Sequence, residues 1–158
     1  MTDWDARWMR LAAEVASWSK DPATKIGCVA VGGERRLLTT GYNGFPRGVN
    51  DDIPQRHDRP LKYLLTEHAE RNGIYNAARN GVDLYNSAMY VTHYPCADCA
   101  RGIIQAGILE VIVPQATEED ISGFGARWAE SHAAARLMFR EAGVRVRVAP
   151  SPSHMPGD

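Results

Sequence analysis

The sequence has few cysteines, no long apolar run and no excess of positive charge, and each shortage excludes a class of protein. Three cysteines among 158 residues are too few for the disulfide framework of a small secreted protein. No apolar stretch approaches the roughly 20 residues that a membrane-spanning helix needs. Residues 1–5 are acidic and contain no apolar targeting segment, so we expect a cytoplasmic protein.

The net charge, the composition and the length further limit the class of protein and the number of domains. A net charge of −1 gives no overall attraction to nucleic acid or to an anionic membrane surface. With 44% hydrophobic and 23% charged residues, the chain has the composition of an ordinary globular protein. We therefore expect one domain over residues 1–150, followed by a flexible tail at 151–158 that is rich in proline and serine.

Helical and extended patterns alternate along the chain, which predicts an α/β fold with helices on both faces of a layered sheet. The predicted helices are residues 3–20, 67–79, 95–106 and 127–141, and the predicted strands are residues 26–31, 36–40, 86–93, 109–113 and 144–148. In the first helix an apolar stripe recurs at spacings of four and three and should pack on the core, with a partner contact as the alternative. The stripe comprises Trp4, Trp8, Leu11, Val15 and Trp18.

One histidine and two cysteines form the clearest chemical pattern. Glu70 follows His68 by two residues, and Cys96 and Cys99 form a Cys-x-x-Cys pair. Three such ligands hold zinc and leave a fourth tetrahedral position for water, which distinguishes a catalytic zinc from a structural one. Zinc lowers the pKa of its bound water to about 7. We predict one zinc at His68, Cys96 and Cys99, with Glu70 as the proton carrier.

Two helix starts would bring these ligands together. We expect Thr66 to cap the second helix, and Pro95 to lie in the first turn of the third helix, which ends at Gly107. The cysteines then share one face near a helix N-terminus, where the dipole favours the metal-binding thiolate. Cys28 lies in a predicted strand and is interpreted as a core residue, with a fourth zinc ligand as the alternative.

His-x-Glu followed by Pro-Cys-x-x-Cys is the mark of zinc-dependent nucleobase deaminases. Over about residues 17–148 the chain resembles the zinc-dependent cytidine deaminase superfamily, and within it the deoxycytidylate deaminases. The segments that carry the resemblance are SWSKDPATKIG at 17–27, GYNGFPRG at 41–48, HAERN at 68–72, YVT at 90–92, PCADCA at 95–100 and IQAG at 104–107. The first two point to the branch that acts on nucleotide monophosphates.

The resemblance implies a three-layer α/β/α sandwich with a central mixed five-stranded sheet. It also implies hydrolysis of dCMP to dUMP and ammonia, in which Glu70 moves the water proton to ring N3 and then to the departing amine. Relatives form homo-oligomers, commonly hexamers, and some are regulated by dCTP and dTTP. The substrate would then be a small nucleotide, and neither a membrane nor a nucleic acid is an expected partner.

The predicted substrate contacts lie in four segments of the chain. Asn43 would bond a sugar hydroxyl or a phosphate oxygen, and Thr24 and Lys25 would meet the 5′-phosphate. The full set of predicted contacts is Thr24, Lys25, Asn43, Arg47, Ala69, His93 and Tyr94. Further cations that compete for the phosphate are Arg56, Arg59 and Lys62, in a loop at 49–62 that we expect to be exposed. The remaining histidines are expected to be ordinary surface residues, and these are His57, His132 and His154.

Several alternatives stay open. A deaminase of adenosine in tRNA would share the zinc pattern but should carry a basic face. A structural zinc site could be closed by His93 as a fourth ligand, although Glu70 would then have no purpose. A related small substrate, such as a modified cytosine nucleotide, a nucleoside or guanine, fits equally well. Gly73 replaces the alanine usual in relatives, and either loosens its helix or makes room for a larger base.

Overall fold

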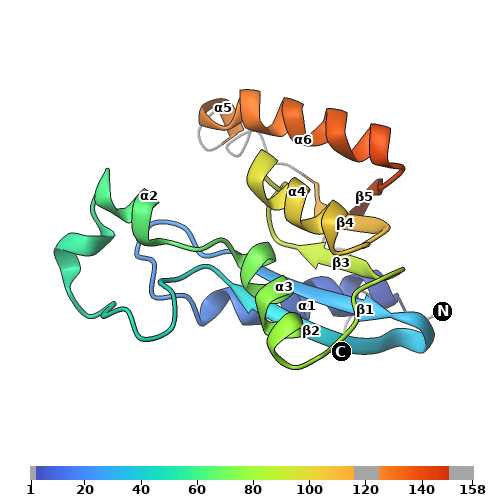
Figure 1. The fold of residues 1–158 in the computed structure, drawn as a ribbon, viewed down its shortest axis with the longest axis horizontal. Helices are drawn as coiled ribbons and strands as arrows, with labels where there is room; N and C mark the ends of the chain where they lie inside the picture. Colours follow the sequence, from blue (N-terminus) through green and yellow to red (C-terminus); the bar gives the residue numbers. More distant parts are fainter. Residues whose placement is uncertain (1–2, 116–124, 150–158) are drawn as a thin grey trace.

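The computed structural model describes residues 3–115 and 125–149, which form one five-stranded sheet covered by helices on both faces (Figure 1). The strands are β1 (Gly27–Gly32), β2 (Arg36–Tyr42), β3 (Ala88–Val91), β4 (Glu110–Pro114) and β5 (Arg145–Ala149). Their order is β2-β1-β3-β4-β5. β1 runs antiparallel to β2 and β3, whereas β3, β4 and β5 are parallel. The predicted mixed sheet is confirmed.

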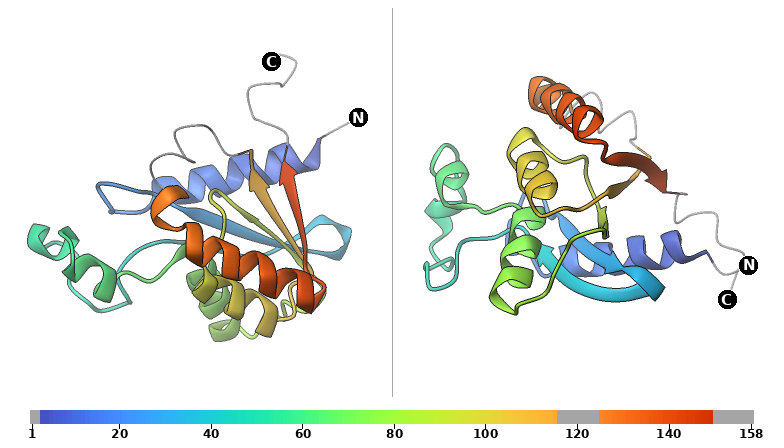
Figure 2. Two further views of the ribbon diagram at one scale, coloured as in Figure 1. Left: turned by 90° about the horizontal axis from the view of Figure 1, so that it is seen from above. Right: turned by 45° about the vertical axis from the view of Figure 1, so that its right-hand side comes forward.

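Four longer helices make the two outer layers. The helices are α1 (Trp4–Ser17), α2 (Leu61–Leu65), α3 (Ala69–Arg79), α4 (Ala97–Gln105), α5 (Gly125–Arg127) and α6 (Ala129–Ala142), with short 3₁₀ turns η1 (Gly33–Arg35) and η2 (Pro54–His57). α1 covers one face of the sheet, and α3, α4 and α6 cover the other (Figure 2). The segment that carries η2 and α2 projects from the body as an arm (Figure 1).

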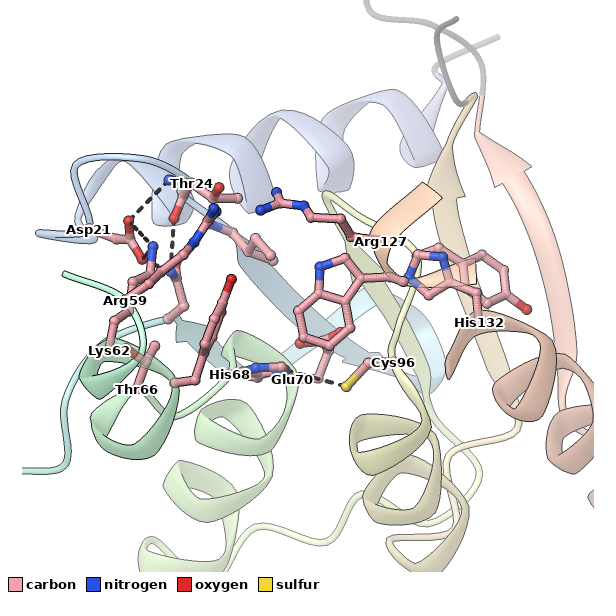
Figure 3. Close-up of a pocket in the computed structure, with 15 residues that line it drawn as sticks. Asp21, Thr24, Arg59, Lys62, Thr66, His68, Glu70, Cys96, Arg127 and His132 are labelled. Atoms are coloured by element: carbon pink, nitrogen blue, oxygen red, sulfur yellow. Dashed lines mark hydrogen bonds and ion pairs between the residues drawn. The ribbon is translucent and has the colours of Figure 1, made fainter. Parts of the chain in front are cut away.

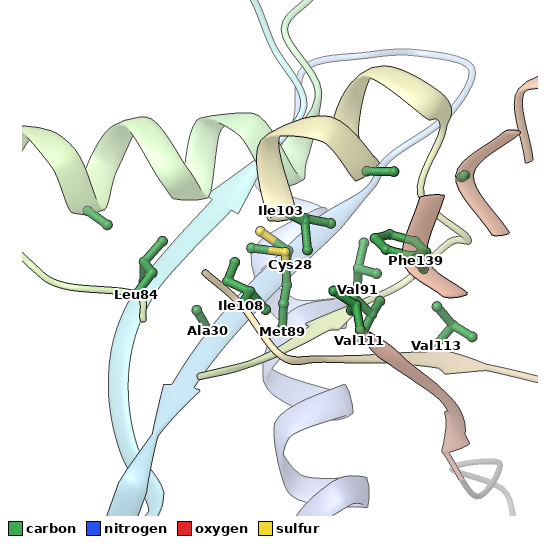
Figure 4. Packing of buried hydrophobic residues seen from close by; sticks show 14 residues of the cluster. Cys28, Ala30, Leu84, Met89, Val91, Ile103, Ile108, Val111, Val113 and Phe139 are labelled. Carbon is green, nitrogen blue, oxygen red and sulfur yellow. The ribbon is translucent and has the colours of Figure 1, made fainter. Parts of the chain in front are cut away.

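Alternation along the strands divides the buried side chains into two clusters. In β1, Cys28 and Ala30 face α3 and α4, whereas Val29 and Val31 face α1, because successive side chains of a strand point to opposite faces. The larger cluster also contains Phe139 of α6 (Figure 4). The interpretation of Cys28 as a buried core residue therefore agrees with its position.

α1 packs through smaller residues than its apolar stripe predicted. Val15 is buried, but Trp18 is 52% exposed, and the other fully covered positions are Ala6, Met9, Ala12 and Ala16. A Cβ atom added to Gly27 of β1 would lie 2.2 Å from the carbonyl oxygen of Ala12. At this close approach only short side chains fit between helix and strand, so Trp8 and Leu11 pack at the edge of the cluster.

The predicted C-termini agree within one residue for α3, α4 and α6, whereas α1 ends at Ser17 and not at residue 20. The predicted N-termini of α3 and α4 are wrong. Gly107 and Gly143 follow α4 and α6 in the left-handed conformation, as helix-ending glycines commonly do. Thr66 does not cap α3, because the main chains of Gly44 and Glu67 pair as an isolated bridge and keep this segment extended up to His68, the N-cap. Pro95 precedes the N-cap of α4, Cys96, which is itself extended.

The strict alternation of valine and arginine at 144–148 predicts an outer strand of the sheet with both arginines facing solvent. β5 is an edge strand, as predicted, and Arg145 is exposed. Arg147 instead donates hydrogen bonds to Asp5 at 2.7 and 3.1 Å and to Glu110 at 2.5 Å. The correction has a simple cause: Asp5 lies in the first turn of α1, which packs on this face of the sheet.

No helix within the described ranges 3–115 and 125–149 is both long enough and apolar enough to cross a membrane. The predicted tail at 151–158 lies outside the described residues.

Replacing Arg147 with Met should lower the free energy of unfolding by about 1 kcal/mol at neutral pH, a typical contribution for partly exposed ion pairs. The hydrogen bond from Arg147 is the main reason why the pKa of Asp5 lies below its ordinary value of 3.8. A carboxylate of this kind stabilises the fold above its unfolded pKa, and the contribution is lost as the pH falls through the folded pKa. Urea unfolding at pH 7 and near pH 3 should therefore give a smaller difference at the lower pH.

Arg145→Met is the matched control on the same strand, because the Arg145 side chain is 76% exposed and approaches Glu110 only to 3.8 Å. Equal effects of the two substitutions, or an Arg147→Met effect that does not depend on pH, would contradict this account.

Candidate metal centre and active site

The starts of α3 and α4 meet at the three predicted metal ligands. His68 is the N-cap of α3, Cys96 is the N-cap of α4, and Cys99 lies in the first turn of α4. Both cysteines are buried, and Glu70 is only 4% exposed. The two helices lie side by side on the sheet, so residues 28 positions apart in the chain face one another across the helix starts (Figure 3).

The distances among the three ligands suit a tetrahedral zinc ion. Nδ1 of His68 lies 3.4 Å from Sγ of Cys96 and 3.5 Å from Sγ of Cys99. Nitrogen and sulfur ligands at ordinary zinc distances and a tetrahedral angle are roughly 3.5 Å apart. Within the described part of the chain, the group of possible ligands comprises these three residues and does not include His93. This arrangement fits a three-ligand site and does not support a site closed by His93.

The electrostatics of the group also favour a cation. Hydrogen bonds from Cys99 and His68 outweigh burial and lower the pKa of Cys96 to about 4. The pKa of Cys99 is raised by its bond to the Cys96 sulfur, by burial and by the nearby Glu70. Burial raises the pKa of Glu70, although His68 opposes this effect. The acidic groups of Cys96, Cys99 and Glu70 thus lie close together in a buried place. A divalent cation bound there would compensate the charge of both thiolates.

A pocket extends from this group toward the loop after α1 and the arm (Figure 3). Its described lining residues are Asp21, Thr24, Ile26, Asn43, Arg59, Lys62, Tyr63, Thr66, His68, Glu70, Tyr94, Cys96, Arg127, Trp128 and His132. Three predicted substrate contacts, Thr24, Asn43 and Tyr94, are therefore brought together with the ligand group. Their roles toward a substrate remain predictions.

The other four predicted contacts are not among these lining residues. Lys25 is exposed and donates to the carbonyl of Ser17 at 3.2 Å. Arg47 bonds Asn76 and lines a different hollow. Ala69 is fully buried, and Nδ1 of His93 lies 3.5 Å from the hydroxyl of Thr92.

Asn43 serves first as a brace for the pocket wall. Its Oδ1 accepts from the Ile26 N–H at 2.8 Å, and its Nδ2 donates to the Thr24 carbonyl at 2.9 Å and to Asp21 at 3.4 Å. Both amide hydrogens are therefore engaged, and one lone pair of Oδ1 is left to accept from a ligand hydroxyl. The expected contact with a phosphate oxygen, which needs a donor, does not suit this arrangement.

A buried ion pair joins the arm to the loop after α1. Lys62 of α2 is 8% exposed, contrary to the predicted exposure of its segment, and its Nζ lies 2.7 and 2.8 Å from the two carboxylate oxygens of Asp21. Asp21 also accepts the N–H groups of Ala23 and Thr24. Burial raises the pKa of Asp21, but these hydrogen bonds outweigh it and the net shift is downward. The charge of Lys62 is thus already neutralised within the protein.

Residues of α5 and α6 complete the pocket and were not predicted. His132 was expected to be an ordinary surface residue, but it lines the pocket with its ring 5.3 Å from that of Tyr94. The ring of Trp128 lies edge-on to His68 at 6.1 Å. Ser131 accepts the Ala97 N–H at 2.8 Å and so ties α6 to the start of α4. One signal was available, namely the grouping of an arginine, a tryptophan and a histidine at 127–132.

Gly73 lies on the face of α3 that packs on the sheet, away from the pocket. A Cβ atom at this position would lie 2.9 Å from Sγ of Cys28, and Gly73 is not among the lining residues of the pocket. The idea that Gly73 makes room for a larger base is therefore wrong.

Comparisons with known proteins agree with the geometry. A model of the cytidine and deoxycytidylate deaminase zinc-binding region matches residues 2–115. The "uncharacterized deaminase in luxG 3′ region" of Aliivibrio fischeri is 42% identical over 146 residues, which cover 92% of this chain and 93% of the relative. Deoxycytidylate deaminase of Homo sapiens is 38% identical over 150 residues, covering 92% of this chain and 79% of the relative. The apo crystal structure of dCMP deaminase from cyanophage S-TIM5 shares the fold, with a TM-score of 0.71, 22% identity, and coverage of 94% of this chain and 98% of that chain.

The purified protein should contain one zinc per chain, and replacing His68, Cys96 or Cys99 with Ala should remove it. Each substitution deletes one of three ligands, so the remaining two cannot retain the ion against a chelator. Elemental analysis after dialysis against a chelator measures this loss. His57→Ala is the matched control, because this imidazole lies outside the ligand group and the variant should keep its zinc. Zinc kept by all three ligand variants, or lost equally from the His57 variant, would contradict the assignment.

Proposed function

The chain belongs to the family of deaminases with a cytidine and deoxycytidylate deaminase zinc-binding region, and on that premise we propose that it hydrolyses dCMP to dUMP and ammonia. The observation that carries the proposal is a three-ligand group that lies beside a buried carboxylate and opens to a pocket with cationic residues in its wall. The S-TIM5 enzyme, which shares the fold, has been crystallised with dCMP and dUMP.

His68, Cys96 and Cys99 would hold the zinc ion. When bound, zinc acts as a Lewis acid that makes water acidic enough to serve as a nucleophile at neutral pH. Glu70 takes the proton of the attacking water and delivers it to ring N3, and a second transfer protonates the exocyclic nitrogen. A C4–O bond forms, the C4–N bond breaks, and ammonia leaves. Burial raises the pKa of Glu70, and a carboxylate with a raised pKa is a stronger base toward the water proton, which it then passes on to the ring.

The pocket walls suit a nucleotide with its base toward the ligand group. Tyr94, Trp128 and His132 provide aromatic surfaces near His68. Thr24 and Arg59 lie at the end of the pocket away from Cys96 (Figure 3). Since Lys62 is already paired with Asp21, Arg59 is the better cation for a monophosphate.

We further propose that the protein acts as a homo-oligomer in the cytoplasm and that residues 1–150 form one deaminase domain. The arm supports self-association, because Leu64 is 82% exposed and Tyr63 is 50% exposed on α2. Exposed apolar side chains on a projecting segment are typical of surfaces that other chains cover.

Glu70→Gln should retain zinc and lose ammonia release by at least about a hundredfold, since general acid–base groups contribute 10²–10⁴ in rate. Glutamine has nearly the same shape as glutamate but cannot carry the proton. The measurement is ammonia release from dCMP alongside zinc content. Glu67→Gln, on the same segment and paired with Arg71, is the control and should remain active. A zinc-loaded Glu70→Gln variant with wild-type activity would refute the role of Glu70.

Arg59→Ala should raise the KM for dCMP about tenfold or more, because a charge-assisted hydrogen bond is worth roughly 1.5–3 kcal/mol. The KM for deoxycytidine should hardly change, since that substrate has no phosphate. Arg56→Ala is the matched control, because Arg56 donates to the Asn50 carbonyl and does not line the pocket. Equal loss for dCMP and deoxycytidine would remove Arg59 from phosphate binding.

The same assay extended to guanine, modified cytosine nucleotides and an adenosine-containing tRNA loop separates the alternative substrates. Faster ammonia release from any of these than from dCMP would replace the proposed substrate.

A further inference from the structure

The helix that carries His68 and Glu70 meets the sheet at a crossing formed by Cys28, Gly41 and Gly73. Cys28 of β1 is completely buried, and its thiol donates to the Ala69 carbonyl at 3.2 Å. Gly41 of β2 is the strand partner of Cys28, and Gly73 lies one turn of α3 beyond Ala69. One thiol thus lies against two turns of α3, while its own strand pairs with β2.

The space at this crossing is fully used. A Cβ atom on Gly41 would lie 2.2 Å from the Ala69 carbonyl oxygen and 2.3 Å from the Gly73 nitrogen, so the helix and the strand touch through their main chains. A Cβ atom on Gly73 would lie 2.9 Å from Sγ of Cys28, which is closer than such atoms are found. Cysteine at 28 and glycine at 73 therefore fill one volume between them.

The crossing is next to the chemistry along the chain. Ala69, whose carbonyl accepts from the Cys28 thiol, stands between His68 and Glu70. The two cysteine ligands lie at the start of α4, which is also tied to α6 by the bond between Ala97 and Ser131. A shift of α3 relative to the sheet therefore moves the imidazole and the carboxylate relative to the two sulfurs.

We propose that Cys28 and Gly73 are a coupled pair of positioning residues that set the height of α3 over the sheet and thereby align His68 and Glu70 with Cys96 and Cys99. The effect on turnover rests on the proposed function. The effect on packing and on the metal does not, because it follows from the crossing alone.

The proposal predicts that the Gly73→Ala substitution has opposite effects on kcat and on stability in the wild type and in the Cys28→Ala variant. Added to the wild type, the methyl group meets the Cys28 sulfur and pushes α3 away from the sheet. Added to Cys28→Ala, it fills the space that the sulfur has left. Misplacement of a catalytic group by 1 Å can cost about a hundredfold in rate.

The experiment compares wild type, Cys28→Ala, Gly73→Ala and the double variant, all loaded with zinc. Gly73→Ala should lower kcat for dCMP about tenfold with a KM change below about twofold, and should release zinc to a chelator sooner than wild type. The double variant should exceed both single variants in kcat, in the midpoint of urea unfolding and in zinc retention. Gly102→Ala is the matched control, since this helical glycine faces the flexible tip of Ile74 at 3.3 Å and should keep wild-type values.

Three results would overturn the proposal. The first is a folded Gly73→Ala variant with wild-type kcat and zinc retention. The second is a double variant whose loss of kcat equals or exceeds the product of the fold losses measured for the two single variants, because the two positions would then be independent. The third applies if Gly73→Ala does not fold. In that case Cys28→Ala is compared with the double variant, and a lower urea unfolding midpoint in the double variant would contradict the proposal. If the wild type releases no ammonia from dCMP, the proposed function fails, while unfolding and zinc retention still test the pair.

Discussion

Main-chain contact between α3 and the strands beneath it is the constraint on which the site depends. At Gly41 no side chain separates the sheet from the first turns of α3, and the close packing of protein interiors leaves little freedom for adjustment at such a contact. The N-cap of α3 is thereby brought level with the start of α4, and an imidazole faces two thiols at 3.4 and 3.5 Å. The ligand geometry is therefore a product of backbone packing as much as of the ligands themselves.

The two ends of the pocket are held in place by different interactions. Its inner end is fixed by helix starts on the sheet, and its outer end by the ion pair between Lys62 and Asp21 and by the Asn43 amide. Because a buried ion pair is costly to break by removing one partner, the arm that carries Arg59 keeps a defined place despite its exposure to solvent.

The sequence predicted what depends on short spacing. The i, i+2 step from His68 to Glu70 and the i, i+3 step from Cys96 to Cys99 define their own neighbourhood, and period-2 and period-3.6 patterns located the elements of the sheet and its cover. The three-ligand group and the mixed sheet followed from these signals together with the family resemblance. Most of the fold and the ligand group at the inner end of the pocket could thus be predicted from the sequence.

What the sequence did not reveal depends on pairs far apart in the chain. Burial of Lys62 requires Asp21, which precedes it by 41 residues, and exposure of its segment was the reasonable expectation for a charged loop. His132 reaches the pocket only because α6 lies on α4. The predicted capping role of Thr66 was wrong because Glu67 pairs with Gly44 in an isolated bridge. No local sequence pattern indicates this pairing.

The arm and the α5–α6 segment, which form much of the pocket wall, come from stretches of chain that contribute none of the three metal ligands. The residues that would hold zinc and the residues of these two outer segments accordingly come from separate parts of the polypeptide. Substitutions in the arm or in α5–α6 can therefore change the shape and charge of the pocket while all three ligands stay in place.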